Sequence, residues 1–175
     1  MSLTVDPVFS LLAVAALALL FATAAVAKVR DRVRFAAVLA AYELVPRPFA
    51  RGAAVLLPFI ELNVAFGLFV KQVRPAAATA AAGLLLIYGA AMGVNLARGR
   101  QDIDCGCEGF GRRRSIAPWM IMRNALLMLV AAVAGAPSTA RDIEWTDAVT
   151  IACGLAAFAM IYFAADRLLA SRRTT

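Results

Sequence analysis

The chain has 175 residues, of which 63% are hydrophobic and only 17% are charged, and its mean hydropathy is +0.79. This composition excludes a soluble domain and indicates a helical integral membrane protein, because the apolar residues come in long blocks. The complete lack of histidine excludes imidazole bases and ligands, and the net charge of +7 does not indicate nucleic-acid binding, because the cations lie in short loops between apolar blocks.

The apolar blocks predict five membrane-spanning helices. A helix of about 20 residues crosses a hydrocarbon core of about 30 Å, and segments near 6–27, 52–70, 75–97, 116–136 and 147–167 are long enough. Between the first and the second, FAAVLAAYELV is too short to span, so we expect an interfacial helix ended by Pro46 and Pro48. The predicted fold is an all-α polytopic transmembrane bundle of four core helices plus a fifth, with residues 1–175 as a single integral membrane domain.

The distribution of cations predicts the orientation. Fourteen of the eighteen lysines and arginines lie in the loop at 28–51, the loop at 98–115 and the C-terminal end. The opposite side of the predicted spans holds three cations, Lys71, Arg74 and Arg141. The positive-inside rule therefore places the N-terminus outside and the loop at 98–115 on the cytoplasmic face of a bacterial-type inner (cytoplasmic) membrane.

Two of the three cysteines, Cys105 and Cys107, stand one glycine apart in that polar loop. One intervening glycine lets the sulfurs approach, and the small ring that they would close is strained, which is typical of an oxidising, labile disulfide. A redox pair is therefore the leading interpretation. Two thiolates also suit a soft ion such as Cu(I) or Hg(II), and two unrelated loop cysteines are the third alternative.

Charged and amide side chains within the apolar segments predict a polar bundle centre. Glu61 and Arg123 are each costly inside a membrane without a partner. We expect them to pair inside the bundle, with Asn63, Asn95 and Asn124 supplying hydrogen bonds. Such a centre suits a quinone head group or a proton path, and the alternative is a structural clamp between helices.

Small residues in two other segments suggest packing roles. Gly89 and Gly93 form a GxxxG pattern, which predicts a close helix–helix contact within the bundle or in a homo-oligomer. Cys153 lies among apolar residues of the fifth segment, and we expect it to be a buried filler.

The run VNLARGRQDIDCGCEGF…SIAPWMIMRNALL resembles the MauE family of methylamine-utilisation membrane proteins and its DoxX-like relatives. Members typically show an Asn-Leu-x-Arg-Gly stretch, an Asp-Cys-Gly-Cys loop and a helix with an Arg-Asn pair. FAAVLAAYELVP and PFIELNVAFGL also resemble the family, so the resemblance covers about residues 5–135. After the second cysteine this chain has Glu-Gly-Phe-Gly, where members usually have Phe-Gly directly.

The resemblance implies a set of functional residues and a redox-associated role. The residues carried over are Glu61, Asn95, Arg98, Asp104, Cys105, Cys107, Arg123 and Asn124. In the family the role is linked to maturation of a disulfide-rich periplasmic dehydrogenase subunit, alongside a thioredoxin-like partner. Arg98 and Asp104 would support the loop that carries the two cysteines.

We therefore predict a thiol–disulfide redox protein in which Cys105 and Cys107 exchange electrons with a thioredoxin-like or other thiol protein. A quinone is the candidate cofactor for the polar centre, and we assign no metal. A membrane transporter or soft-metal-handling protein, and a structural anchor for a partner enzyme, are the alternatives. A periplasmic partner conflicts with a cytoplasmic loop, so either electrons cross the bundle, the partner differs, or one segment does not span.

Overall fold

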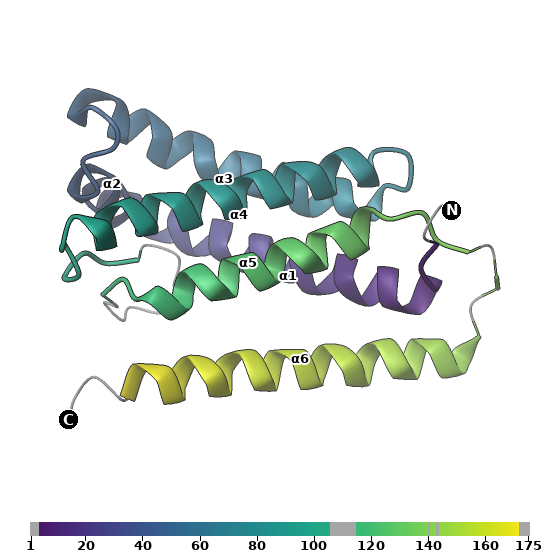
Figure 1. Ribbon diagram of the computed structural model, residues 1–175. Helices are drawn as coiled ribbons and strands as arrows, with labels where there is room; N and C mark the ends of the chain where they lie inside the picture. Colours follow the sequence, from purple (N-terminus) through teal and green to yellow (C-terminus); the bar gives the residue numbers. More distant parts are fainter. Residues whose placement is uncertain (1–3, 106–114, 140, 143, 172–175) are drawn as a thin grey trace.

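The computed structural model describes residues 4–105, 115–139, 141–142 and 144–171. These residues contain helices α1 (Pro7–Arg30), α2 (Arg32–Ala41), α3 (Arg47–Phe69), α4 (Arg74–Ala97), α5 (Pro118–Gly135) and α6 (Trp145–Ser171), as Figure 1 shows. All of them except α2 are long and apolar enough to cross a membrane. The predicted all-helical, multi-pass fold is confirmed.

Four helices form the bundle and the fifth long helix lies beside it. Helices α1, α3, α4 and α5 pack in a closed ring, in which each helix contacts the next and α5 returns to α1. Helix α6 runs alongside α1, outside this ring (Figure 1). The short α2 packs against α3 at the end of the bundle where α1 ends. This is the predicted arrangement of four core helices, a fifth, and a short helix between the first two spans.

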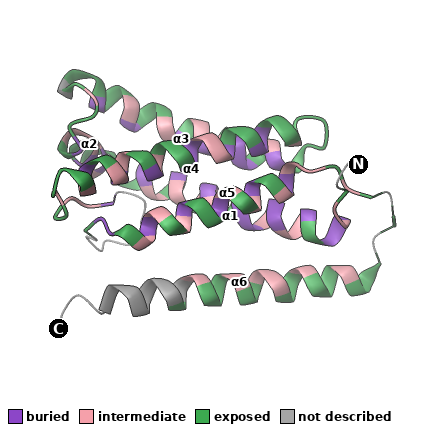
Figure 2. Cartoon of the chain, in the orientation of Figure 1, coloured by how far each residue is buried: buried purple, intermediate pink, exposed green. Residues whose placement is uncertain are grey.

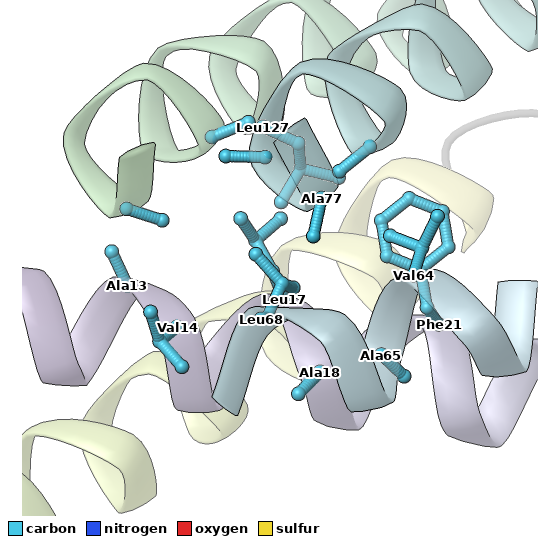
Figure 3. Packing of buried hydrophobic residues seen from close by; sticks show 14 of the residues in the cluster. Ala13, Val14, Leu17, Ala18, Phe21, Val64, Ala65, Leu68, Ala77 and Leu127 are labelled. Atoms are coloured by element: carbon cyan, nitrogen blue, oxygen red, sulfur yellow. The ribbon is translucent and has the colours of Figure 1, made fainter. Parts of the chain in front are cut away.

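The core follows from apolar stripes of helical period. On α1 the buried residues Val14, Leu17, Phe21 and Ala25 recur three or four positions apart and share one face. Figure 3 shows this face meeting side chains of the neighbouring helices, such as Leu68 of α3. Many large apolar side chains are exposed, among them Phe9, Phe66 and Leu129, and Figure 2 shows exposed positions along each of the long helices. Such an outer surface suits contact with lipid chains.

The chain between α2 and α3 differs from the prediction. Helix α2 ends at Ala41, well before the prolines, and Glu43 adopts a left-handed φ of 52°. Pro48 lies in the first turn of α3, where a missing N–H leaves no helical hydrogen bond unmade. The prediction that Pro46 and Pro48 end the interfacial helix is therefore wrong, because Pro48 serves instead to begin the next span.

The two glycines of the GxxxG pattern lie against α5. A Cβ placed on Gly89 would lie 3.7 Å from Cβ of Asn124, and one on Gly93 would lie 3.6 Å from Cδ1 of Ile121. The GxxxG pattern allowed a helix contact within the bundle or in a homo-oligomer, and the structure shows the contact within the bundle.

The prediction that Cys153 is a buried filler is wrong. Cys153 is exposed, because α6 lies outside the ring of four helices.

Polar contacts join the ends of α1 and α6 on the side of the bundle away from α2. Nε of Arg141 lies 3.2 Å from Oδ2 of Asp6, and Nη2 lies 2.9 Å from Oδ1 of Asp147. Asp6 also accepts the N–H of Val8, which caps α1. This N–H and Arg141 together hold the pKa of Asp6 below its ordinary value. The contacts attach α6 to α1 at its first turn.

Candidate functional site

The segment that carries Cys105 begins at a well-formed helix end. Arg98 is the C-cap of α4, and Gly99 follows with φ +73°. The N–H of Gly99 donates to the carbonyl of Leu96 (3.0 Å), and that of Arg100 donates to the carbonyl of Asn95 (2.9 Å). This pair of bonds is a Schellman motif, and a left-handed residue at that position favours glycine. The Asn-Leu-x-Arg-Gly stretch therefore ends α4 and directs the chain across the end of the bundle.

The two described arms of the loop, one leading to Cys105 and one leading into α5, lie side by side. The N–H of Ile116 donates to the carbonyl of Ile103 at 3.0 Å, and Asp104 pairs with Ser115 in antiparallel fashion. Ile116 and Ala117 are buried directly before α5 begins. The two described arms of the loop are thus held together at their base.

Cys105 is buried at this base, with 6% of its surface exposed. It packs in an apolar cluster with Val38 of α2, Tyr42 at the C-cap of α2, Met92 of α4 and Met120 of α5. Its Sγ lies 3.8 Å from Sδ of Met92, and its carbonyl accepts a hydrogen bond of 3.4 Å from the hydroxyl of Tyr42. The thiol therefore lies between α2 and the four-helix bundle.

Two ion pairs bind this segment to α2 and the turn after it. Nη2 of Arg34 donates to Oδ2 of Asp104 at 2.6 Å, and Nη1 of Arg100 lies 2.8 Å from Oε2 of Glu43. The hydrogen bond to Asp104 raises the pKa of Arg34 above its ordinary value. Arg98 was predicted to support the loop. Its side chain is exposed, and the residue forms the C-cap of α4.

Asn95 belongs to the same site. Its side chain is fully buried, and its Nδ2 donates to the carbonyls of Tyr42 (3.3 Å) and Ala91 (3.1 Å). It therefore joins α4 to the end of α2, and its carbonyl accepts the N–H of Arg100 in the turn that leads to Cys105. The predicted partner of Cys105, Cys107, lies at 106–114, outside the described residues.

Glu61 lies in the bundle interior and its partner is Lys28, not Arg123. Glu61 is fully buried, and Oε1 accepts from Nζ of Lys28 and from the hydroxyl of Tyr88, the latter at 2.7 Å. Nζ of Lys28 also lies 5.1 Å from the ring centre of Tyr88 and 5.4 Å from that of Phe35. A cation between aromatic faces and a carboxylate is well placed in an apolar interior.

Arg123 faces the outer helix rather than the centre. Its guanidinium lies 5.4 Å from the ring centre of Trp119 and 5.6 Å from that of Tyr162 on α6. The next residue, Asn124, is buried between α5 and α4 beside Gly89. The expected pairing of Glu61 with Arg123 is therefore wrong, because Glu61 contacts side chains of α1 and α4 while Arg123 lies against the ring of Tyr162 on α6.

Asn63 does not contribute to the bundle interior either. Its side chain is exposed, and its Nδ2 donates to the carbonyl of Phe59 on its own helix at 2.8 Å. The five residues predicted for one polar centre thus lie in different places: Glu61 with Lys28, Asn63 on the exposed side of α3, Asn95 beside the Cys105 segment, Asn124 at the α4–α5 contact and Arg123 toward α6.

The Cys105 and Glu61 sites contain four further residues that the sequence analysis does not predict there: Lys28, Tyr88, Arg34 and Tyr42. Lys28 had a signal in the sequence, because it continues the buried stripe of α1 at the spacing of Phe21 and Ala25. Arg34 and Tyr42 had none, since the partners that place them in this site are 53 or more residues away along the chain.

Helix α4 connects the two sites. Tyr88, Met92 and Asn95 lie on successive turns, about 4.5–6 Å apart along the axis. Tyr88 contacts Glu61, Met92 contacts Cys105, and Asn95 contacts the end of α2. Within the described residues, no three or more Cys, Asp or Glu side chains group as a metal site would require.

Comparison of the sequence with known proteins shows which family the chain resembles. Residues 6–137, from the cap of α1 to just beyond α5, match the sequence model of "Methylamine utilisation protein MauE". The chain is 37% identical over 153 residues to the methylamine utilization protein MauE of Paracoccus denitrificans, which covers 87% of this chain and 82% of the relative. The MauE protein of Methylophilus methylotrophus is 35% identical over 173 residues, with coverage of 96% and 90%.

A third relative agrees with these two. The MauE protein of Methylorubrum extorquens is 40% identical over 131 residues, which covers 75% of this chain and 70% of the relative. No solved structure matches the chain significantly.

Proposed function

The chain belongs to the MauE family of membrane proteins, and we propose that it is a thiol–disulfide redox protein that takes part in methylamine utilisation. The observation that supports this most directly is the built environment of Cys105. Contacts from α2, α4 and α5 hold this thiol at one end of the bundle, two residues before a second cysteine. A loop with incidental cysteines needs no such support.

The proposed reaction is exchange with a thioredoxin-like partner. Cys105 and Cys107 as dithiol lose two electrons and two protons when they form a disulfide, and the partner's disulfide gains both and becomes a dithiol. The same exchange runs in reverse when the partner is reduced and the pair is oxidised. The transfer passes through a mixed disulfide between the two proteins.

Removal of either cysteine is expected to abolish growth on methylamine. The test uses a methylamine-utilising host whose own MauE protein has been removed and replaced by this chain. Cys105→Ser and Cys107→Ser should each stop growth on methylamine and leave growth on a multicarbon source unchanged, because one thiol cannot form the intramolecular disulfide. Cys153→Ser, at an exposed site on α6, is the matched control and should grow normally. Normal growth of a Cys105/Cys107 double variant would favour the anchoring alternative.

Soft-metal handling is the second candidate, and one contact favours it. Sγ of Cys105 lies 3.8 Å from Sδ of Met92, and thiolate and thioether sulfur are ligands preferred by Cu(I). Anaerobic titration with Cu(I) separates the two functions. Stoichiometric binding that Cys105→Ser and Met92→Leu both abolish would support metal handling, and weak binding unaffected by either change would support thiol exchange.

We further propose that the end of the bundle that carries Cys105 faces the cytoplasm, on the basis of the cation count. Arg32 and Lys71 are exposed at opposite ends of the bundle. In protein whose cysteines are replaced by serine, Lys71→Cys should react with a membrane-impermeant maleimide in intact spheroplasts. Arg32→Cys should react in inverted vesicles alone. The reverse pattern would place the site on the outer face.

A further inference from the structure

The two ends of the bundle differ in what their cations contact. At the end away from α2, Arg141 binds the carboxylates of Asp6 and Asp147. Nε of Arg74 donates to the carbonyl of Leu68, near the end of α3, at 3.0 Å. Two of the three cations predicted for that side of the membrane are therefore bound by groups of the protein itself.

The end of the bundle where α1 ends and α3 begins carries four exposed arginines, which we call the arginine surface: Arg30, Arg32, Arg51 and Arg98. They lie at the end of α1, the start of α2, the second turn of α3 and the C-cap of α4, which meet at one end of the molecule (Figure 1). Within the part of the chain that the structure describes, none of the four forms an ion pair with a carboxylate.

The carboxylates at the same end do not neutralise the arginine surface. Two of them already bind other arginines, Arg34 and Arg100. Two more, Asp31 and Asp102, are exposed, and Asp31 caps α2 by accepting the N–H of Arg34 at 3.0 Å. Among the described residues, two surface carboxylates without a cation thus stand against four arginines without a carboxylate, and this end of the bundle stays positively charged.

Large apolar side chains are exposed among these arginines. Val33, directly after Arg32, is 84% exposed, the highest value among the described large apolar residues. Phe49, two residues before Arg51, is 67% exposed. At the end of a membrane bundle, cations and large apolar side chains on one surface are typical of a segment at the lipid–water boundary, where the apolar groups lie among acyl chains and the cations among head groups.

We propose that the arginine surface binds the phosphate groups of anionic phospholipids, with Val33 and Phe49 inserted among their acyl chains. The planar guanidinium donates two parallel N–H bonds to phosphate oxygens, and each cation at an anionic surface adds to the attraction. Bound lipid would hold α2, which covers Cys105, at the depth of the head groups. This inference goes beyond the proposed thiol–disulfide function and does not depend on it.

The test is native mass spectrometry of the purified chain, released from detergent micelles that contain equal amounts of phosphatidylglycerol and phosphatidylcholine with the same acyl chains. The measured quantity is the ratio of the two lipids in complexes with one bound lipid. We expect the unaltered chain to prefer phosphatidylglycerol. Arg32→Gln and Arg51→Gln should each lower the ratio by up to about fivefold, and replacement of all four arginines by Gln should remove the preference.

Matched variants separate this surface from net charge. Lys71→Gln removes an exposed cation at the opposite end of the bundle and should leave the ratio unchanged. Arg32→Lys and Arg51→Lys keep the charge and should retain most of the preference. No preference in the unaltered chain, an unchanged ratio in the fourfold variant, or an equal loss in Lys71→Gln would each overturn the proposal. Displacement of phosphatidylglycerol by an equal concentration of inorganic phosphate would also overturn it, in favour of a site for free phosphate.

A second measurement tests the inserted side chains in vesicles of phosphatidylglycerol with brominated acyl chains. In protein whose cysteines are replaced by serine, a fluorophore attached through Val33→Cys should be strongly quenched by the bromine atoms. A fluorophore attached through Asp102→Cys, at an exposed polar position of the same end, should be quenched much less. Equally weak quenching at both positions would contradict insertion of Val33.

Discussion

Lys28→Met is expected to lower the free energy of unfolding by about 3–5 kcal/mol, the usual cost of leaving one member of a buried ion pair without the other. Glu61 is fully buried among apolar residues of the bundle, and Lys28 is the cation that its carboxylate contacts. The hydroxyl of Tyr88 donates to the same oxygen and cannot replace the positive charge. The measurement is reversible unfolding by sodium dodecyl sulfate in mixed micelles.

A matched control and a double variant distinguish pairing from a general effect of losing a lysine. Lys71→Met removes an exposed cation from the opposite end of the bundle and should change stability by less than about 0.5 kcal/mol. Lys28→Met combined with Glu61→Gln should recover most of the loss, because no unpaired charge then stays buried and the amide can still accept from Tyr88. Equal losses for Lys28→Met and Lys71→Met would contradict the assigned pair.

Gly135→Ala is expected to destabilise the contact between α4 and α5 by about 1–3 kcal/mol, the usual cost of inserting a methyl group into a closely packed position. A Cβ on Gly135 would lie 2.8 Å from Cβ of Ala78, and the backbone of Pro75 is 3.8 Å away on the same side. Neither neighbour has a flexible side chain that could move aside. The helices must therefore separate, which the same unfolding measurement detects.

Ala78→Gly in the Gly135→Ala protein supplies the sharpest check. Removing the opposing methyl group should restore stability to within about 1 kcal/mol, which is the ordinary cost of one glycine inside a helix. Gly83→Ala is the matched control, because a Cβ there meets nothing within 4 Å. It should be neutral or stabilising. If Gly135→Ala were as harmless as Gly83→Ala, the close approach of α4 and α5 at this point would be wrong.

Several features of this protein could be predicted because they depend on nearby residues. Apolar blocks of about 20 residues predict spans wherever they occur, and each of the five predicted blocks forms a helix that is long and apolar enough to cross a membrane. The predicted end of the third segment at 97 agrees with the end of α4, which depends on a left-handed residue and two backbone bonds within six residues. Glu61 was correctly singled out as needing a partner, because burial of a lone carboxylate is costly anywhere in a membrane.

The identity of that partner could not be predicted in the same way. Arg123 and Glu61 lie in apolar segments of comparable hydropathy, while Lys28 stands at the end of its segment, where the sequence pattern groups it with the loop cations. Only the packing of α1 against α3 turns the last buried position of α1 toward Glu61.

The sequence by itself determined the class of the protein, its spans and the place of Cys105 at one end of them, since hydropathy and helix capping act over a few turns. The tertiary structure decided which polar groups meet: Arg34 with Asp104, Tyr42 with Cys105, and Lys28 with Glu61. The physical reason is that a hydrogen bond or ion pair depends on separations of a few ångströms between side chains of different helices. Those separations exist only once the helices have packed.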